Sequence, residues 1–459
     1  MKKTSLPIAA LLLAGAASAA PSPHDRVYTA DQNTNTISVF NPATNTLLGQ
    51  IKLGNMRPDV LSPLYRGEVN VHGLGFSPDH KTMIAIANGS NSVTFIDTAT
   101  NRVKGKTYVG RSPHEGFFSA DGKEVWVVVR GEDYISVIDP LTFKETGRIQ
   151  TEVGPGMVQF HRDGKLAFVV SSFTPTMDVI DVQTHQIVKR ISVTSPFSPF
   201  LQFTPDQREV WMTHKDVGKV TRIDTRTLEV IEVIDTGFIT NHLAFANVDG
   251  KVQAYVTVGG ENLVKVFSTG PKAQLLASIP TGALPHGIWT SDDSSRLYVG
   301  LENGDGVDVL DPRQNRIIAH MDGGQAPQAL LYLSGVVGDD GGTANLVPRV
   351  NGDSFNIALT AVSGQARGFA VVRPLGVVNG FEVSMFKLKP DTDYGVYLEG
   401  NAAPVGSFHS DAKGAANGTM IGPVRTPAAP DAVTGGHRLI VMEGAAALDP
   451  AKAVLISAK

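Results

Sequence analysis

Short runs of β-branched and aromatic residues alternate with polar turn residues along most of this chain. Several stretches follow one plan, in which a β-rich run meets a polar turn, a second run ends at or near Ile-Asp or Leu-Asp, and a third run follows another turn. These stretches are residues 26–51, 83–105, 125–149, 254–269 and 297–321. A short strand such as HGLGFSPDH (72–80) or HEGFFSADG (114–122) precedes the full units. The pattern predicts a repeat of four antiparallel strands joined by tight turns.

The repeats can be counted from one position, which stands seven residues before a turn aspartate in all units except the last. Successive copies are 42, 42, 43, 43, 44 and 42 residues apart. The position holds, in chain order, His72, His114, Gly156, Pro199, His242, His286 and Gln328. This count predicts an all-β, seven-bladed β-propeller over residues 26–333, with an open pair of β-sandwiches as the alternative.

The two ends of the repeat region are incomplete in complementary ways. Three strands, residues 26–52, precede the first counted position, and a single inner strand, residues 327–333, follows the last full unit. We expect these pieces to form one blade together. Pairing the two ends of the chain in this way leaves no open sheet edge, which repeated β-sheets must avoid.

Composition changes after Leu333. Residues 334–345, SGVVGDDGGTAN, are rich in glycine and acidic residues and read as a linker. The remainder, 346–459, alternates like short antiparallel strands and predicts a small C-terminal β-sandwich. It contains no catalytic pattern, so a protein partner is the expected ligand of this domain.

Several short motifs give the repeat a family resemblance. They are AYVTVGG (254–260), the endings -SVID, -TFID and -DVLD, and the turns FSPD and FSADG. With these motifs the chain resembles the YVTN-type seven-bladed β-propellers over residues 26–333. That family is similar to lactonase-type and d1-haem-type propellers and includes binding proteins without a known reaction. The resemblance implies the fold and leaves the function open.

The chain begins MKKTSLPIAALLLAGAASAAPSP, with two lysines, an apolar run and a small-x-small site at Ala17–Ala19. Residues 1–20 are therefore expected to form a cleaved signal peptide, which predicts a periplasmic or secreted protein. A membrane anchor is the alternative, but the run Leu6–Ala16 is short for a bilayer, and no later stretch reaches that length, so no membrane span is expected.

Charge and cysteine content exclude several classes of site. The formal net charge is −4, and losing Lys2 and Lys3 with the leader makes it more negative, which argues against a nucleic-acid partner. The chain has no cysteine, which excludes disulfides, thiolate metal sites, iron–sulfur clusters and covalently attached c-type haem. Histidine, aspartate, glutamate and methionine remain as metal ligands.

Histidine occupies the counted position in four of the seven units: His72, His114, His242 and His286. In a propeller this position enters the innermost strand, so the four imidazoles should ring one mouth of the central channel. Gly156 and Pro199 leave the opposite side of that ring without long side chains. Neutral imidazoles converging from different blades suit copper, zinc or iron, which predicts a transition-metal site.

Other polar residues are expected at the same mouth and are candidates for binding a ligand. Some lie in the turn after the second strand of each blade or beside a histidine, and others lie in the long approach between Gly54 and His72, which is a candidate partial lid. The candidates are Asp31, Asn88, Arg130, His214, Glu302, Gln328, Glu115, Tyr65 and Arg66. Glu115 and Glu302 are also of the type that orients metal-bound histidines.

Two further interpretations remain open. The mouth could hold a small anionic or polar molecule between the imidazoles, Arg130 and Arg66, with a histidine as general acid or base in a lactonase-like or metal-dependent redox enzyme. The histidines could also be copies inherited with the repeat, in which case the protein is an interaction scaffold without a ligand.

Overall fold

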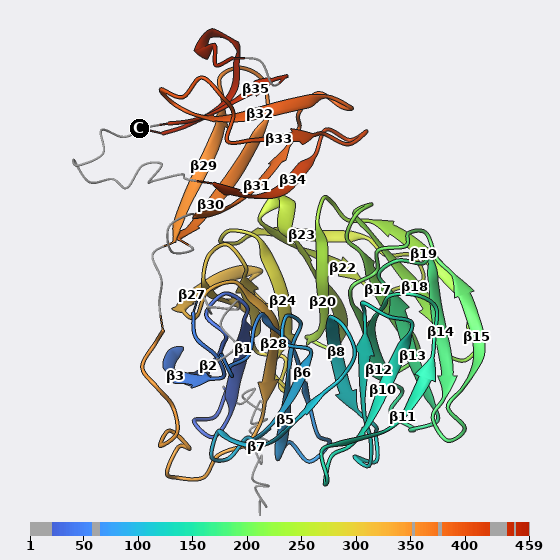
Figure 1. Cartoon of the computed structure of the whole chain (residues 1–459). Coiled ribbons are helices and arrows are strands. Elements are labelled where there is room, and N and C mark those ends of the chain that lie inside the picture. Colours follow the sequence, from blue (N-terminus) through green and yellow to red (C-terminus); the bar gives the residue numbers. More distant parts are fainter. Residues whose placement is uncertain are drawn as a thin grey trace, which may run out of the picture.

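The computed structural model describes residues 21–56, 65–350, 354–374, 379–422, 438–444 and 447–458. The predicted signal peptide, residues 1–20, and residues 57–64 of the long approach to His72 lie outside this part of the chain. Two bodies are visible in Figure 1: a ring of radially arranged sheets and a smaller domain above it. No helix within the described ranges is long and apolar enough to cross a membrane.

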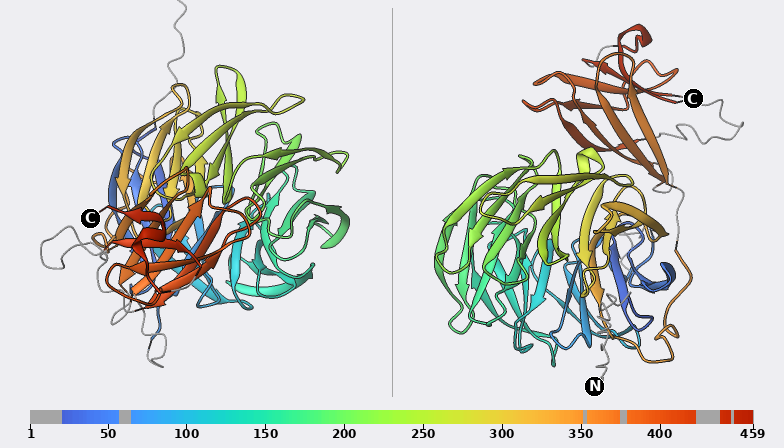
Figure 2. Two further views of the ribbon diagram at one scale, coloured as in Figure 1. Left: turned by 90° about the horizontal axis from the view of Figure 1, so that it is seen from above. Right: turned by 180° about the vertical axis from the view of Figure 1, so that it is seen from behind.

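The ring is a seven-bladed β-propeller of four-stranded antiparallel sheets, as predicted (Figures 1 and 2). Blade 1 comprises β4 (Val71–Phe76), β5 (Thr82–Ala87), β6 (Ser92–Asp97) and β7 (Arg102–Tyr108). Blade 2 comprises β8 (Pro113–Phe118), β9 (Val125–Val129), β10 (Tyr134–Asp139) and β11 (Lys144–Gln150). Blade 3 comprises β12 (Pro155–Phe160), β13 (Leu166–Ser171), β14 (Thr176–Asp181) and β15 (Gln186–Ser192). Blade 4 comprises β16 (Leu201–Phe203), β17 (Glu209–His214), β18 (Lys219–Asp224) and β19 (Val230–Asp235).

The remaining blades continue the same order from the channel outward. Blade 5 comprises β20 (Thr240–Val248), β21 (Lys251–Val258), β22 (Leu263–Ser268) and β23 (Leu275–Pro280), with the short 3₁₀ helix η1 (Gly259–Glu261) in its second turn. Blade 6 comprises β24 (Pro285–Thr290), β25 (Leu297–Leu301), β26 (Gly306–Asp311) and β27 (Arg316–Asp322). Blade 7 comprises β28 (Pro327–Leu333), β1 (Arg26–Asp31), β2 (Thr36–Asn41) and β3 (Thr46–Lys52).

Blade 7 closes the ring by joining the two ends of the repeat region. β1 pairs antiparallel with β28, from Arg26 opposite Leu333 to Asp31 opposite Pro327. Tyr332 on β28 donates its hydroxyl to Asp25, which precedes β1. The expectation that residues 26–52 complete the blade of strand 327–333 is therefore confirmed.

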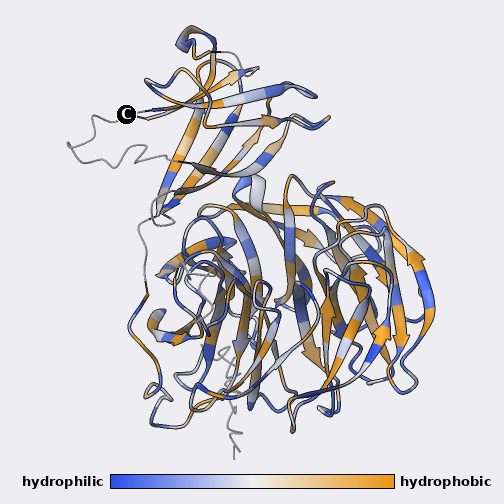
Figure 3. Ribbon diagram, viewed as in Figure 1, coloured by the Kyte–Doolittle hydropathy of each residue, from blue (hydrophilic) through white to orange (hydrophobic). Residues whose placement is uncertain are grey.

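Burial follows the position of each strand within its blade. Second strands such as β9 are apolar throughout and fully buried, because both faces pack against neighbouring blades. Outer strands such as β11, KETGRIQ, are largely exposed. Large side chains, including Trp126 and Trp211, fill the space between sheets. Figure 3 shows the resulting alternation of apolar and polar stretches along the strands.

The predicted C-terminal β-sandwich takes the form of one eight-stranded sheet that curls nearly into a barrel. Its strand order is β33-β32-β35-β36-β29-β30-β31-β34, and the 3₁₀ helix η2 (Pro450–Lys452) precedes β36. The strands are β29 (Phe355–Ala361), β30 (Arg367–Pro374), β31 (Asn379–Phe386), β32 (Asp393–Leu398), β33 (Gly406–His409), β34 (Ala416–Gly422), β35 (Leu439–Glu443) and β36 (Ala453–Ser457). Phe381, Val396 and Val441 are among the buried side chains of its core.

The C-terminal domain contacts the propeller face that carries the turns after the second strands. Arg373 on β30 donates to the carbonyl of Glu302 at 2.7 Å and to the carboxylate of Asp305 at 2.8 Å, both in one turn of blade 6. Lys413 donates to the carbonyl of Val217 in blade 4 at 2.8 Å. The domain therefore lies above one mouth of the channel, as the side views also show (Figures 1 and 2).

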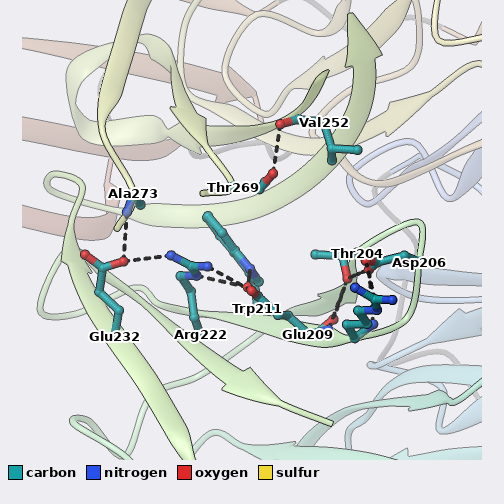
Figure 4. A network of polar contacts seen from close by, with 10 residues as sticks. Thr204, Asp206, Glu209, Trp211, Arg222, Glu232, Val252, Thr269 and Ala273 are labelled. Atoms are coloured by element: carbon teal, nitrogen blue, oxygen red, sulfur yellow. Dashed lines mark hydrogen bonds and ion pairs between the residues drawn. The ribbon is translucent and has the colours of Figure 1, made fainter. Parts of the chain in front are cut away.

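A buried arginine joins two strands of blade 4 (Figure 4). The side chain of Arg222 is 1% exposed and donates two hydrogen bonds to Glu209, at 2.8 and 3.0 Å, and one to Glu232 at 2.8 Å. Glu209 also accepts from the indole of Trp211 at 2.7 Å, and Glu232 accepts from the backbone of Ala273 in blade 5 at 2.9 Å. The network fixes the position of blade 4 against blade 5.

Replacing Arg222 with alanine is expected to destabilise the propeller by about 3 kcal/mol, because two partly buried carboxylates lose their counter-charge. Urea denaturation at neutral pH measures the change. Arg226→Ala, which removes an exposed arginine from the following turn, is the matched control. A loss below about 1 kcal/mol in Arg222→Ala would show that the network contributes no more than a surface ion pair.

Candidate functional site

Each of the four histidines lies in a β-bulge of its inner strand. The pairing register shifts between Val71 and Gly73 around His72, and between Pro113 and Gly116 around His114. The same irregularity surrounds His242 and His286. A bulge adds one residue to a strand. The side chain of the added residue does not follow the regular alternation of side chains between the two faces of the sheet. The repeated bulge is thus the local reason why the counted position faces the channel mouth.

His72 and His114 meet directly across the gap between blades 1 and 2. Their Nε2 atoms lie 2.8 Å apart, and both side chains are less than 10% exposed. On the other side of each ring, Nδ1 faces an oxygen: His72 Nδ1 lies 2.8 Å from Gln32 Oε1, and His114 Nδ1 lies 2.6 Å from the carbonyl of Gly156. Because these oxygens can only accept, each Nδ1 carries the proton.

This pattern of protons leaves two Nε2 lone pairs pointing at each other. In neutral histidine only one ring nitrogen is protonated, so neither Nε2 can donate a hydrogen bond to the other. Two acceptors at 2.8 Å repel unless a cation lies between or beside them. Histidines that bind metals have this same arrangement, with Nδ1–H held by an oxygen and Nε2 directed at the ion.

His286 and His242 continue the row of rings around the mouth. The His286 ring centre is 6.4 Å from that of His72 and 4.6 Å from that of His242. His286 Nδ1 lies 3.1 Å from the carbonyl of Gln328, so its Nε2 is also free to accept. His242 stacks on Phe200 with ring centres 4.0 Å apart. The structure therefore brings the four rings together as an arc, with His72 and His114 as its tightest pair.

Glu115 is the carboxylate nearest to this pair. One ligand atom from each of His72, His114 and Glu115 lies within 4.8 Å of the other two. The position across from Glu115 must be glycine, because a Cβ on Gly73 would come within 2.9 Å of the Glu115 carboxylate and 2.3 Å of the His114 carbonyl. Burial raises the pKa of Glu115 well above its usual value, while Arg130 acts in the opposite direction.

A cavity of about 510 Å³ opens beside the histidines. Two cationic side chains reach it, Arg130 from the turn after β9 and Lys215 from the turn after β17. Burial lowers the pKa of both groups, and the carboxylates of Glu302 and Glu382 raise that of Lys215. Glu382 belongs to β31, so the C-terminal domain contributes to the electrostatics of the cavity. The full lining is Gln32, Asn70, His72, Asn88, Gly89, Ser112, His114, Arg130, Phe197, Pro199, Lys215, His286 and Gln328.

The candidate ligand residues fall into two groups. Asn88, Arg130 and Gln328 line the cavity. Glu302 lies next to it, with its carboxylate 4.0 Å from His286 Nε2, and Glu115 lies behind the histidine pair.

The other four candidates do not line the cavity. Asp31 is fully buried and accepts hydrogen bonds from Thr29, Thr36 and Ser38. His214 is held between Ser198 and Thr221. In the approach loop, the Tyr65 hydroxyl donates to the carbonyl of Glu68, and Arg66 is exposed.

In blades 7 and 4 the residue predicted from the sequence to face the mouth lies one position before the residue that does so. The residue that faces the mouth comes directly after the second strand of each blade: Gln32 follows β1, and Lys215 follows β17. Asp31 and His214 are the last residues of those strands, and their side chains point the other way because successive residues alternate. The rule that the first residue after the second strand of a blade faces the mouth selects Gln32 and Lys215. It also selects Asn88, Arg130 and Glu302, which the sequence pattern already identifies.

Comparison with known proteins supports the fold type. No family model matches the chain. An uncharacterized protein of Salmonella typhimurium, YncE, is 33% identical over 79 residues, which is 17% of this chain and 22% of that protein. The solved structure of a periplasmic gluconolactonase of Pseudomonas aeruginosa, PpgL, aligns with a TM-score of 0.54 at 14% identity, covering 68% of this chain and 99% of that one. At this identity the alignment shows a shared β-propeller fold.

A second solved structure shares the fold. Dihydro-haem d1 dehydrogenase, NirN, aligns with a TM-score of 0.50 at 13% identity, covering 79% of this chain and 71% of that one. At such identities the two structures share the propeller fold with this chain and carry no information on its ligand. The match to the Salmonella relative spans about a fifth of that protein.

Acidification is expected to destabilise the metal-free propeller through its site histidines. Burial is the largest cause that holds the pKa of all four well below the usual value of about 6.5. Below pH 6.5 the unfolded chain binds protons that the folded chain does not, so each histidine lowers the stability by at most about 1.4 kcal/mol per pH unit. The loss begins at the unfolded pKa and ends at the folded one.

The comparison is between wild type and His72→Gln/His114→Gln, unfolded in urea with chelator at pH 7 and pH 5. The double variant should lose less stability over this range, because glutamine does not titrate. His214, whose pKa burial lowers to about 4, is present in both proteins and cancels in the difference. Equal losses in the two proteins would mean that the pair is not held neutral.

Proposed function

We propose that this protein is an exported metal-binding propeller whose channel mouth holds a transition-metal ion through His72 and His114. The observation that carries the proposal is the pair of unprotonated Nε2 atoms facing each other at 2.8 Å, each fixed by an oxygen acceptor on Nδ1. A metal ion removes the repulsion between the lone pairs and uses both as ligands. The leader-like start of the sequence supports export.

The spacing of the pair indicates which metals fit. Two nitrogens at right angles on an ion, each about 2.0–2.1 Å from it, are about 2.9 Å apart, whereas a tetrahedral angle separates them by about 3.4 Å. The observed 2.8 Å matches the right-angle arrangement found in square-planar or octahedral ions. Copper(II) is the strongest binder among such ions at nitrogen sites. We therefore infer a preference for copper(II) over zinc.

The neighbouring groups supply the remaining positions around such an ion. Glu115 is close enough to act as a third ligand. The Nε2 of His286 faces the cavity from blade 6, on the other side of His72. A site assembled from separate blades is rigid, because each histidine is held by the bulge of its own strand and by an oxygen of another blade or turn.

Metal analysis of purified protein tests the proposal. The wild type should bind one copper(II) ion per chain with a Kd in the micromolar range or below, measured by titration after chelator treatment. His72→Ala/His114→Ala should bind at least about a hundredfold more weakly, since two imidazole ligands are lost.

His409→Ala removes an exposed histidine of the C-terminal domain and is the matched control; it should bind like wild type. Wild-type protein that takes up no copper, zinc, nickel or iron at micromolar concentration would refute the proposal. Equal copper affinity in the wild type and the double variant would place the metal elsewhere. The double variant should still melt cooperatively, because the backbone pairing of the strands in blades 1 and 2 does not depend on the two histidine side chains.

A further inference from the structure

Two cationic side chains at the mouth make no close ion pair among the described residues. Neither the guanidinium of Arg130 nor the ammonium of Lys215 makes a salt bridge or a side-chain hydrogen bond there, although both line the cavity. Arg222, the buried arginine of blade 4, is by contrast paired closely with Glu209 and Glu232. Leaving a partly desolvated charge without a close counter-charge is costly, so the arrangement requires an explanation.

The two cations enter the cavity from different blades, Arg130 from the turn after β9 in blade 2 and Lys215 from the turn after β17 in blade 4. Arg130 acts electrostatically on His72 and His114, and Lys215 acts on His72, His242 and His286. Phe197 and Pro199, which precede β16 in blade 4, also line the cavity and carry no charge. The cavity of about 510 Å³ is larger than a metal ion with its bound water requires and has room for a small molecule as well.

The charge balance of the occupied site points to an anion. The neutral histidines carry no charge, and a divalent ion would add two positive charges beside Arg130 and Lys215. The carboxylates near the mouth are Glu115, whose side chain is close to the histidine pair, and Glu302, which lies 4.0 Å from His286 Nε2. Glu382, from the C-terminal domain, acts electrostatically on Lys215 but lies too far from it to form an ion pair. These groups leave a positive excess in a partly desolvated cavity.

We propose that the metal is bound together with a small oxyanion, a carboxylate or a phosphate, which coordinates the ion with one oxygen and is held by Arg130 and Lys215 with the others. Planar guanidinium groups bind such anions with two parallel hydrogen bonds, and a lysine adds a point charge. The inference rests on the proposed metal site, because the ion is one of the groups that hold the anion. It makes the mouth a ternary site for a metal and an anion.

Thermodynamic linkage provides the test. If the metal raises the affinity of the protein for the anion by some factor, the anion must raise the affinity of the protein for the metal by the same factor. Copper(II) is titrated into chelator-treated wild-type protein in non-coordinating buffer, alone and with about 20 mM acetate or about 20 mM inorganic phosphate. At least one of the two anions should lower the Kd for copper by about tenfold or more. The arm that responds identifies the oxyanion class.

The same titrations are made with Arg130→Gln/Lys215→Gln and with the matched control Arg111→Gln. Arg111 is an exposed arginine at the same rim, which donates to the carbonyl of Gly131. The double variant should keep its copper site and lose the anion effect to below about twofold, while Arg111→Gln should behave like wild type. Electron paramagnetic resonance of the copper-loaded wild type should also change when the responding anion is added.

The outcomes separate this inference from the function on which it rests. Copper binding that neither anion alters in wild type, with an unchanged spectrum, overturns the ternary site and leaves the metal site standing. An anion effect that persists in the double variant also overturns it, because the anion would then not be held by these cations. A wild-type protein that binds none of copper, zinc, nickel and iron overturns both proposals; one that binds zinc, nickel or iron in place of copper is titrated with that ion. If the double variant fails to fold, Lys215→Gln alone and the wild-type spectrum still decide the question.

Discussion

The pairing of β1 with β28 is the contact on which the remainder of the propeller depends. It converts a row of sheets, each able to bury its faces only against a neighbour, into a ring in which every blade has two neighbours. It also reaches the candidate site directly. Gln32, which follows β1, accepts the hydrogen bond of His72 Nδ1, so the first strands of the chain orient a histidine of blade 1.

The backbone sets the chemistry of the mouth as much as the side chains do. The bulge in each inner strand turns the counted residue toward the channel, and carbonyls of the next blade hold His114 and His286 by Nδ1. Any residue can supply a carbonyl, so this arrangement needs no special sequence in blades 3 and 7. The imidazole orientation thus comes from the repeat geometry, and histidine at the counted position supplies the Nε2 lone pair that faces the mouth.

The sequence predicts the architecture well because the same pattern occurs in seven repeats. The spacing of about 42 residues and the turn aspartates are sufficient to count the blades and to pair residues 26–52 with 327–333. The site is predicted less completely. The four histidines can be aligned by register, but Lys215 was missed because the end of a strand could not be located within one residue, and one residue reverses the direction of a side chain. The position of Glu382 above Lys215 depends on how two domains pack, which has no local signal in the sequence.

The way His72 is held also sets an order of events. Its acceptor, Gln32, lies close to the beginning of the chain, and the strand that brings Gln32 into place, β28, is the last of the propeller to be synthesised. A chain that still lacks β28 can form blades 1 and 2 and place His114, yet it leaves His72 without its oriented proton. The pair at the mouth is therefore complete only after the ring has closed. Under the proposed function, metal loading follows ring closure, and a partly made chain offers free ions no finished site.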